Sequence, residues 1–188
     1  MTALDGLLIL VGLIVIIVCA MDGVLRALVM LVSFYLISTA TGLVTLATDV
    51  LHGIAGSIAS VTGSSVPNIV VTQTFVFVVL TAPLFIGAYF IGKVIIEDTT
   101  LPKLQVLDNI LGAIIGIVLA LLIMALIYNT WGAAVSVRWN NVQAWNSMWM
   151  AYANSWLRPH LREILVTSRP IYIVFSYLEY PLFFTLQA

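Results

Sequence analysis

The chain has very few charged residues. Only 8% of its 188 residues are Asp, Glu, Lys or Arg, whereas an ordinary soluble domain has about 25%. The formal net charge is −1, and because a nucleic-acid partner needs clustered Lys and Arg, this composition excludes that class of partner. In place of charge the chain is 62% hydrophobic, which predicts an integral membrane protein.

Cysteine and histidine are almost absent as well. The single cysteine, Cys19, cannot form an internal disulfide, and in its hydrophobic run we expect it to pack as a small residue. Of the two histidines, His160 is expected at a solvated or interfacial position, and His52 at the membrane surface, with a metal or pigment ligand as the less favoured alternative. No H-E-x-x-H, P-loop or G-x-S-x-G motif occurs. We therefore expect no catalytic site and no cofactor, while a bound lipid is left open.

Hydrophobic runs without charge show where the chain crosses the membrane. Four hydrophobic intervals without Asp, Glu, Lys, Arg or His are 6–21, 27–48, 53–92 and 109–137. A crossing needs about 20 apolar residues, and the first half of the third interval is rich in Gly and Ser and contains Pro67, which favours a loop. The fold class is therefore an all-α integral membrane protein with a four-span domain, residues 1–129. The predicted transmembrane helices are about residues 5–22, 25–47, 69–93 and 109–129.

Ionisable residues are absent from the middle of every predicted span. Transporters and pumps keep such residues for function despite their cost in a membrane, so the sequence disfavours both classes. Ser38, Thr41, Gly42 and Thr45 lie on roughly one face of the second span, and we expect Ser38 and Gly42 to serve helix packing. The alternative for this face is a small channel or exporter component for an uncharged solute or peptide.

Small residues recur at every fourth position of the last span, at Gly112, Gly116 and Ala120. In a membrane this spacing lets two helix backbones approach closely. We expect this face to pack against the protein's own spans rather than against a second copy. Asp108 comes just before it and is expected to be the helix N-cap, where a carboxylate accepts backbone N–H groups and complements the helix dipole.

Residues 130–188 form a tail that holds all five tryptophans. One face of an amphipathic, aromatic-rich helix is predicted there from residues spaced four, three and four apart. These residues are Trp145, Trp149, Tyr152 and Trp156. Such a face suits the lipid headgroup level, and the alternatives are a partner protein or the protein's own surface. The hydrophobic run 171–178 is too short to span a membrane and needs cover by lipid or a partner.

The basic residues predict an orientation. Arg26, Lys93 and Lys103 lie in the turns between spans one and two and between spans three and four. By the positive-inside tendency these turns face the cytoplasm, and both termini then lie on the non-cytoplasmic side. Four arginines in the tail argue the other way, but the short turns are the better indicator because the rule loses force for long segments.

Three short motifs point to a family. An acid, Asp5, begins the first span, and Gly23 and Arg26 lie in the turn after it. The last span opens with "LDNILGAIIG", whose motif residues are Asp108, Leu111, Gly112 and Gly116. In these features the chain resembles the colicin V production (CvpA) family of small bacterial inner-membrane proteins, over residues 3–130. The positions that depart from the family pattern are Asp22, Ala27, Asn109, Leu119 and Ala120.

The resemblance implies a four-span protein of the bacterial inner membrane without established catalytic activity, with roles in colicin production and envelope maintenance. The sequence and the resemblance together predict a structural or accessory protein that is not an enzyme. Its expected partners are other integral membrane proteins in a larger membrane complex, together with the lipid bilayer itself. The helix faces and the tail are the expected binding surfaces.

Overall fold

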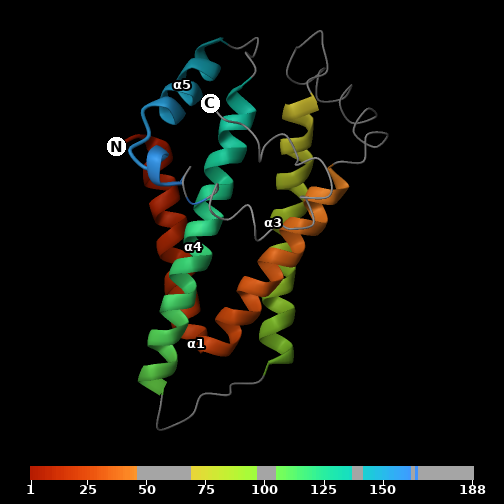
Figure 1. The fold of residues 1–188 in the computed structure, drawn as a ribbon, viewed down its shortest axis with the longest axis vertical. Coiled ribbons are helices and arrows are strands. Elements are labelled where there is room, and N and C mark those ends of the chain that lie inside the picture. Colours follow the sequence, from red (N-terminus) through yellow and green to blue (C-terminus); the bar gives the residue numbers. More distant parts are fainter. Residues whose placement is uncertain (46–68, 97–104, 137–141, 162–163, 165–188) are drawn as a thin grey trace.

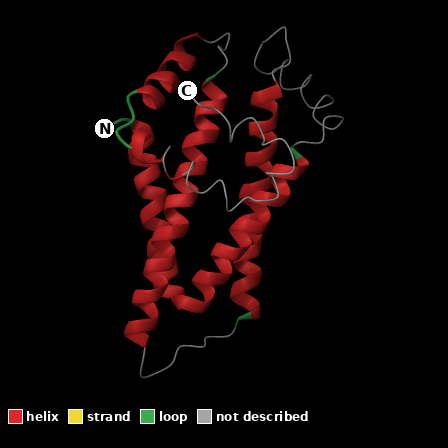
Figure 2. Ribbon diagram, in the orientation of Figure 1, coloured by secondary structure: helices red, strands yellow, loops and turns green. Residues whose placement is uncertain are grey.

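The computed structural model describes residues 1–45, 69–96, 105–136, 142–161 and 164. In this part of the chain every regular element is a helix, and no strand occurs (Figure 2). The helices are α1 (Ala3–Val44), α3 (Ile69–Ile95), α4 (Gln105–Val135) and α5 (Val142–Ala153). The predictions for His52, for Lys103 and for the run 171–178 lie outside the described residues.

Three of the helices, α1, α3 and α4, are long and apolar enough to cross a membrane. Their exposed sides are as hydrophobic as their buried sides: Leu10, Phe90 and Ile114 are all more than half exposed. A helix that is apolar all round belongs in a protein core or a membrane. The predicted all-helical membrane fold is confirmed, with three candidate spans where the sequence predicted four, because one helix contains the first two predicted spans.

That helix, α1, bends at Gly23. Gly23 has φ 79° and ψ 176°, a conformation that glycine adopts without the strain a side chain would bring. Figure 1 shows the first arm of α1 running from the N-terminus to the bend, and the second arm returning from it. At 1.5 Å per residue each arm is about 30 Å long, close to the thickness of a bilayer's hydrocarbon core.

The helices form a bundle with two distinct ends. α4 lies along the first arm of α1, which is its most extensive contact, and α3 lies along the second arm (Figure 1). The bend of α1, the end of α3 and the start of α4 are at one end, called here the bend end. The start of α1, the end of α4 and α5 are at the other, called the tail end.

Candidate functional site

The small residues of α4 lie directly against the first arm of α1. A Cβ added at Gly112 would overlap the carbonyl oxygen of Cys19 and come within 3.0 Å of the carbonyl carbon of Gly23. At Gly116 an added Cβ would lie 2.7 Å from the Cβ of Cys19. Ala120 is buried as well. This face therefore packs inside the chain, with the two helix backbones in contact and Cys19 enclosed between them.

The small and hydroxyl residues of the second arm are also buried. Ser38 donates from Oγ to the carbonyl of Tyr35 at 3.1 Å, and Gly42 is buried one turn later. Thr41 lies on the same face, and its hydroxyl oxygen is 2.8 Å from that of Thr81 on α3. This face therefore joins the second arm to α3.

At the bend end, the carboxylate of Asp108 holds the bend of α1. Asp108 was predicted to cap its own helix, but α4 begins three residues earlier, at Gln105, so Asp108 lies in the first turn. One of its carboxylate oxygens accepts the backbone N–H of Val24 at 3.0 Å. The first N–H groups of a helix have no partner within it, and a break at Gly23 creates such groups inside α1. Asp108 therefore acts as an N-cap for the second arm, supplied by a different helix.

Two further side chains fasten this end. With its amide oriented so that the nitrogen donates, Asn109 bonds the carbonyl of Ala20 at 3.2 Å, on the first-arm side of the bend. Arg26 donates from Nη2 to the carbonyl of Ile96 at 2.7 Å, just beyond α3, and its other terminal nitrogen lies 3.8 Å from Asp22. The bend end thus ties α1, α3 and α4 together through polar groups. The remaining motif residue, Leu111, is 40% exposed on α4.

At the tail end, the buried carboxylate of Asp5 joins the start of α1 to the turn after α5. Asp5 is 0% exposed. It forms a capping box with Thr2, whose backbone N–H donates to Asp5 at 2.7 Å. The same carboxylate accepts the hydroxyl of Ser155 at 2.5 Å and the backbone N–H groups of Trp156 and Leu157 at 3.2 and 3.4 Å. We call this group of bonds the Asp5 anchor.

The sequence showed Asp5 only as a family-motif residue at the start of the first span and did not reveal this role. The spacing of Thr2 and Asp5 resembles a capping box, so the bond between these two residues could have been predicted from the sequence. The contact with Ser155 spans 150 residues of sequence, and neither residue carries a local pattern that points to the other.

The predicted aromatic face of the tail divides between the inside and the outside of the protein. Trp145 donates from its indole nitrogen to the carbonyl of Val135 at 3.0 Å, and the buried ring of Tyr152 stacks on Tyr128 with centroids 4.7 Å apart. Trp149 is 37% exposed, and Trp156, which lies beyond the end of α5, is 62% exposed. Two of the four aromatic residues therefore pack on the protein's own surface, and two face outward.

An apolar cavity of about 260 Å³ lies between both arms of α1, α3 and α4. Its only hydroxyl groups are those of Thr81 and Thr130; the first pairs with Thr41, and the second donates to the carbonyl of Ile127 at 2.9 Å. The lining residues do not form a continuous polar path. In the described part of the chain, no three His, Cys, Asp or Glu side chains come together as a metal site would require.

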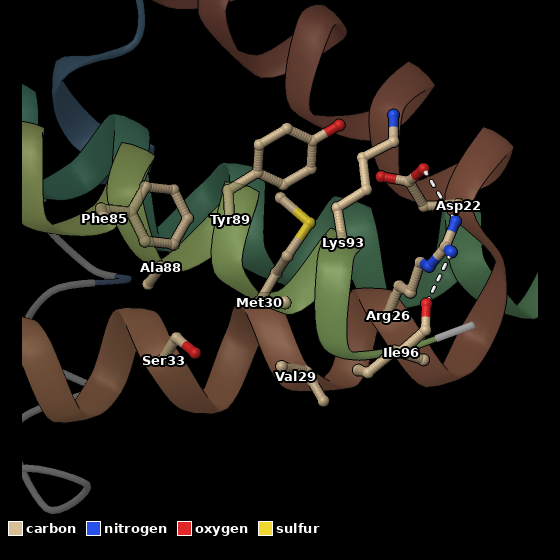
Figure 3. A pocket seen from close by; sticks show the side chains of 11 residues that line it. Asp22, Arg26, Val29, Met30, Ser33, Phe85, Ala88, Tyr89, Lys93 and Ile96 are labelled. Atoms are coloured by element: carbon tan, nitrogen blue, oxygen red, sulfur yellow. Dashed lines mark hydrogen bonds and ion pairs between the residues drawn. The ribbon is translucent and has the colours of Figure 1, made fainter. Parts of the chain in front are cut away.

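A narrower cleft lies between the second arm of α1 and α3, nearer the bend end (Figure 3). Asp22, Arg26 and Lys93 are at its polar end, and Phe85 and Ser33 are at its other end. The ammonium of Lys93 lies 5.8 Å from the centroid of the Tyr89 ring, a cation–π contact within α3.

The comparisons with known proteins agree with the motifs. The family model of the colicin V production protein matches residues 4–165. No curated protein and no solved structure matches the chain. The matched region extends beyond residue 130 and includes α5 and Ser155, so the bend lies within it, as do Asp5 and its partners Ser155, Trp156 and Leu157. The chain is therefore a membrane protein that belongs to the colicin V production (CvpA) family.

Proposed function

We propose that this protein is a non-catalytic accessory subunit of a larger complex in the bacterial inner membrane, and that its tail end binds another integral membrane protein. One observation carries the proposal. The backbone N–H of Trp156 is held by the buried carboxylate of Asp5, while the side chain of Trp156 is 62% exposed. Exposed tryptophan on a fixed backbone is typical of residues that dominate binding at protein interfaces, because little conformational entropy is lost when the partner arrives.

The surroundings of Trp156 support a binding surface. On α5, Trp149 and Met150 are also exposed, the latter by 59%. Aromatic residues and methionine are enriched at interfaces, while Lys, Glu and Asp are depleted there. The described residues of α5 include no charged side chain. We name Trp149, Met150 and Trp156 the outer aromatic patch.

The absence of catalysis is proposed from the use that the ionisable groups already have. Asp5 holds the turn after α5, Asp108 caps the second arm of α1, and Arg26 bonds the carbonyl beyond α3. A catalytic site needs an acid, a base or a nucleophile converging on one protected volume. These three groups instead serve structural contacts at opposite ends of the bundle.

We further propose four membrane crossings, with both termini outside the cytoplasm. The two arms of α1 run in opposite directions, and each is about as long as a bilayer is thick. With α3 and α4 they would cross the membrane alternately. The bend end carries Arg26 and Lys93, so it faces the cytoplasm by the positive-inside tendency. The tail end then faces the periplasmic side.

The alternative of a small channel or exporter component is less well supported. The hydroxyls of Ser38 and Thr45 donate to carbonyls of their own helix, and that of Thr41 contacts Thr81. Hydroxyl groups used in this way stabilise helix packing. The cavity beside them is lined almost entirely by apolar side chains, which offers a polar solute few hydrogen-bonding groups.

Photo-cross-linking in cells tests the partner proposal. A photoreactive amino acid at Trp156 is expected to capture one integral membrane protein of defined mass. The matched control is the same substitution at Gln143, an exposed polar position on α5, where no such product is expected. Cross-links from Trp156 to lipid alone, or equal products from both positions, would overturn the proposal.

Cysteine labelling tests the orientation, because the single native cysteine is fully buried. In cells whose outer membrane is permeabilised and whose inner membrane is intact, an impermeant maleimide is expected to label Gln143→Cys at the tail end. Gln105→Cys at the bend end is expected to react only after the inner membrane is permeabilised. The reverse pattern would show that the orientation is inverted. Labelling of both sites while the inner membrane is intact would contradict the proposed crossings.

A further inference from the structure

We propose that an anionic phospholipid binds along the seam between the second arm of α1 and α3. Its headgroup phosphate contacts Lys93, and one of its acyl chains enters the apolar cavity near the middle of the bundle. This site is separate from the outer aromatic patch and does not depend on the proposed protein partner.

The cavity is suited to a hydrocarbon chain. Its volume is about 260 Å³, and an apolar cavity of about 150 Å³ already binds benzene. The two hydroxyl groups in its lining are bonded to protein atoms, Thr81 with Thr41 and Thr130 with the carbonyl of Ile127. An occupant therefore needs no polar group at this depth.

The cavity opens at α3. Phe34 and Phe77 form part of its wall and are almost fully buried, whereas Val78 and Ile86 line it and are 45% and 56% exposed. Because α3 is one of the helices able to cross a membrane, its exposed side lies among lipid acyl chains. A lipid chain is therefore the apolar group that meets this opening.

A continuous face of α3 connects the cavity to the charged cleft of Figure 3. Phe85 lines both, and the α3 residues along the way are spaced three or four apart, as on one helix face. These residues are Val78, Ala82, Phe85, Tyr89 and Lys93, and Gly92 lines the cleft next to Lys93. At Gly92 an added Cβ would meet only Val29, at 3.7 Å, so the seam has no obstructing side chain there.

The length of this path matches a lipid. Along a helix the rise from Lys93 to Phe85 is about 12 Å, and that from Lys93 to Val78 is about 22 Å. Half of a bilayer's hydrocarbon core is about 15 Å thick. A lipid whose headgroup is at Lys93 therefore places the far part of an acyl chain at the cavity.

The charge at the end of the path selects an anionic headgroup. Arg26 is occupied by Asp22 and by the carbonyl of Ile96, so its charge is offset locally. Lys93 is exposed, and among the described residues no carboxylate lies within ion-pair distance of it. Basic residues at the membrane surface attract anionic lipids, and the long side chain of Lys93 can reach the headgroup level.

Native mass spectrometry of the full chain in mild detergent tests the site with two probes, phosphatidylglycerol and phosphatidylcholine with matched acyl chains. We expect one phosphatidylglycerol to be retained in preference to phosphatidylcholine, by about fivefold for one lysine contact. Lys93→Gln should abolish this preference. An excess of inorganic phosphate should not displace the lipid, which distinguishes a lipid site from a simple phosphate site.

Filling the cavity tests the position of the acyl chain. Ala82→Phe should lower the retention of both lipids, because its ring would occupy the opening. Ala40→Phe is the matched control, since Ala40 is exposed on the second arm and lines neither cavity nor cleft. Helix content by circular dichroism checks that both variants fold. Equal retention of the two lipids by the unmodified chain, or unchanged retention in Ala82→Phe, would overturn the proposal.

Discussion

At each end of the bundle an aspartate carboxylate joins two segments of the chain, but the packing around the carboxylate differs between the ends. At the bend end, Asp108 accepts one backbone N–H, beside a direct contact between helix backbones at Gly112. At the tail end, Asp5 accepts one hydroxyl and two backbone N–H groups from the turn after α5. There the neighbouring contact is made by a side chain, because the ring of Tyr152 lies against Gly132.

This difference indicates how each end responds to change. Backbone atoms cannot move without displacing a helix, so the bend end has little room to adjust, since packed interiors tolerate extra volume poorly. A tyrosine ring can rotate or shift. The tail end therefore depends more on the hydrogen bonds of Asp5 than on close packing. Loss of the Asp5 carboxylate should release the tail without unfolding the membrane helices.

The largest effect is expected from Gly112→Ala. The new Cβ would overlap the carbonyl oxygen of Cys19 and force α1 and α4 apart, at a cost of about 3 kcal/mol in the free energy of unfolding. At the tail end, Gly132→Ala meets the ring of Tyr152 and should cost about 1 kcal/mol. Thermal unfolding in detergent measures both. Gly87→Ala, where an added Cβ meets nothing within 4 Å, is the control; equal losses in the first two variants would erase the distinction between the ends.

Next in size is Asp5→Ala. It leaves the Ser155 hydroxyl and the backbone N–H groups of Trp156 and Leu157 without their acceptor, and hydrogen bonds to a charged group contribute about 1.5–3 kcal/mol. Hydrogen exchange should accelerate at Trp156 and Leu157, while the membrane helices keep their protection. In Asp5→Asn the exchange rates of these two amides should lie between those of the unmodified chain and those of Asp5→Ala. Unaltered exchange at both amides in Asp5→Ala would show that the anchor does not hold the tail.

A smaller effect is expected from Asp108→Ala, which removes the cap of Val24. Loss of an N-cap costs about 1–2 kcal/mol, so the thermal unfolding midpoint should fall by less than in Gly112→Ala. Asparagine caps helices nearly as well as aspartate, so Asp108→Asn should restore most of the stability. If the asparagine variant is as unstable as the alanine variant, Asp108 does not act as a cap.

The smallest effect is expected from Ser155→Ala. Asp5 would keep the two backbone donors of Trp156 and Leu157, so the loss should stay below about 1 kcal/mol. Hydrogen exchange at Trp156 should rise less than in Asp5→Ala. Ser147→Ala is the control, because the exposed hydroxyl of Ser147 donates to the carbonyl of Gln143 in the same helix. An effect as large as that of Asp5→Ala would mean that the hydroxyl alone makes the anchor.

The features that depend on local sequence could be predicted. The hydrophobic runs predicted the start of α3 at Ile69, and Asp22 with Gly23 predicted a turn. Both signals are contained in a few neighbouring residues. The spacing of Gly112 and Gly116 likewise indicated a close helix contact. Periodicity alone did not show that α5 ends at Ala153, because an aromatic repeat continues to Trp156 whether or not the helix does.

The features that depend on distant residues could not be predicted. The partner of Asp108 is 84 residues away, at Val24, and that of Asp5 is 150 residues away, at Ser155. A carboxylate at a helix start is compatible with its own helix or with any neighbour, so its partner is decided only by how the helices pack. The cavity likewise arises from the spacing of four helical segments, none of which encodes it separately.

The long sequence separation of these two bonds has a consequence for biosynthesis. Ribosomes add about 5–20 residues per second, so roughly 4–17 s pass between the synthesis of Val24 and that of Asp108. For Asp5 the delay until Ser155 is roughly 8–30 s. During this interval the bend of α1 lacks the cap from Asp108, and the carboxylate of Asp5 has only its local partner Thr2, so both long-range contacts form late in synthesis.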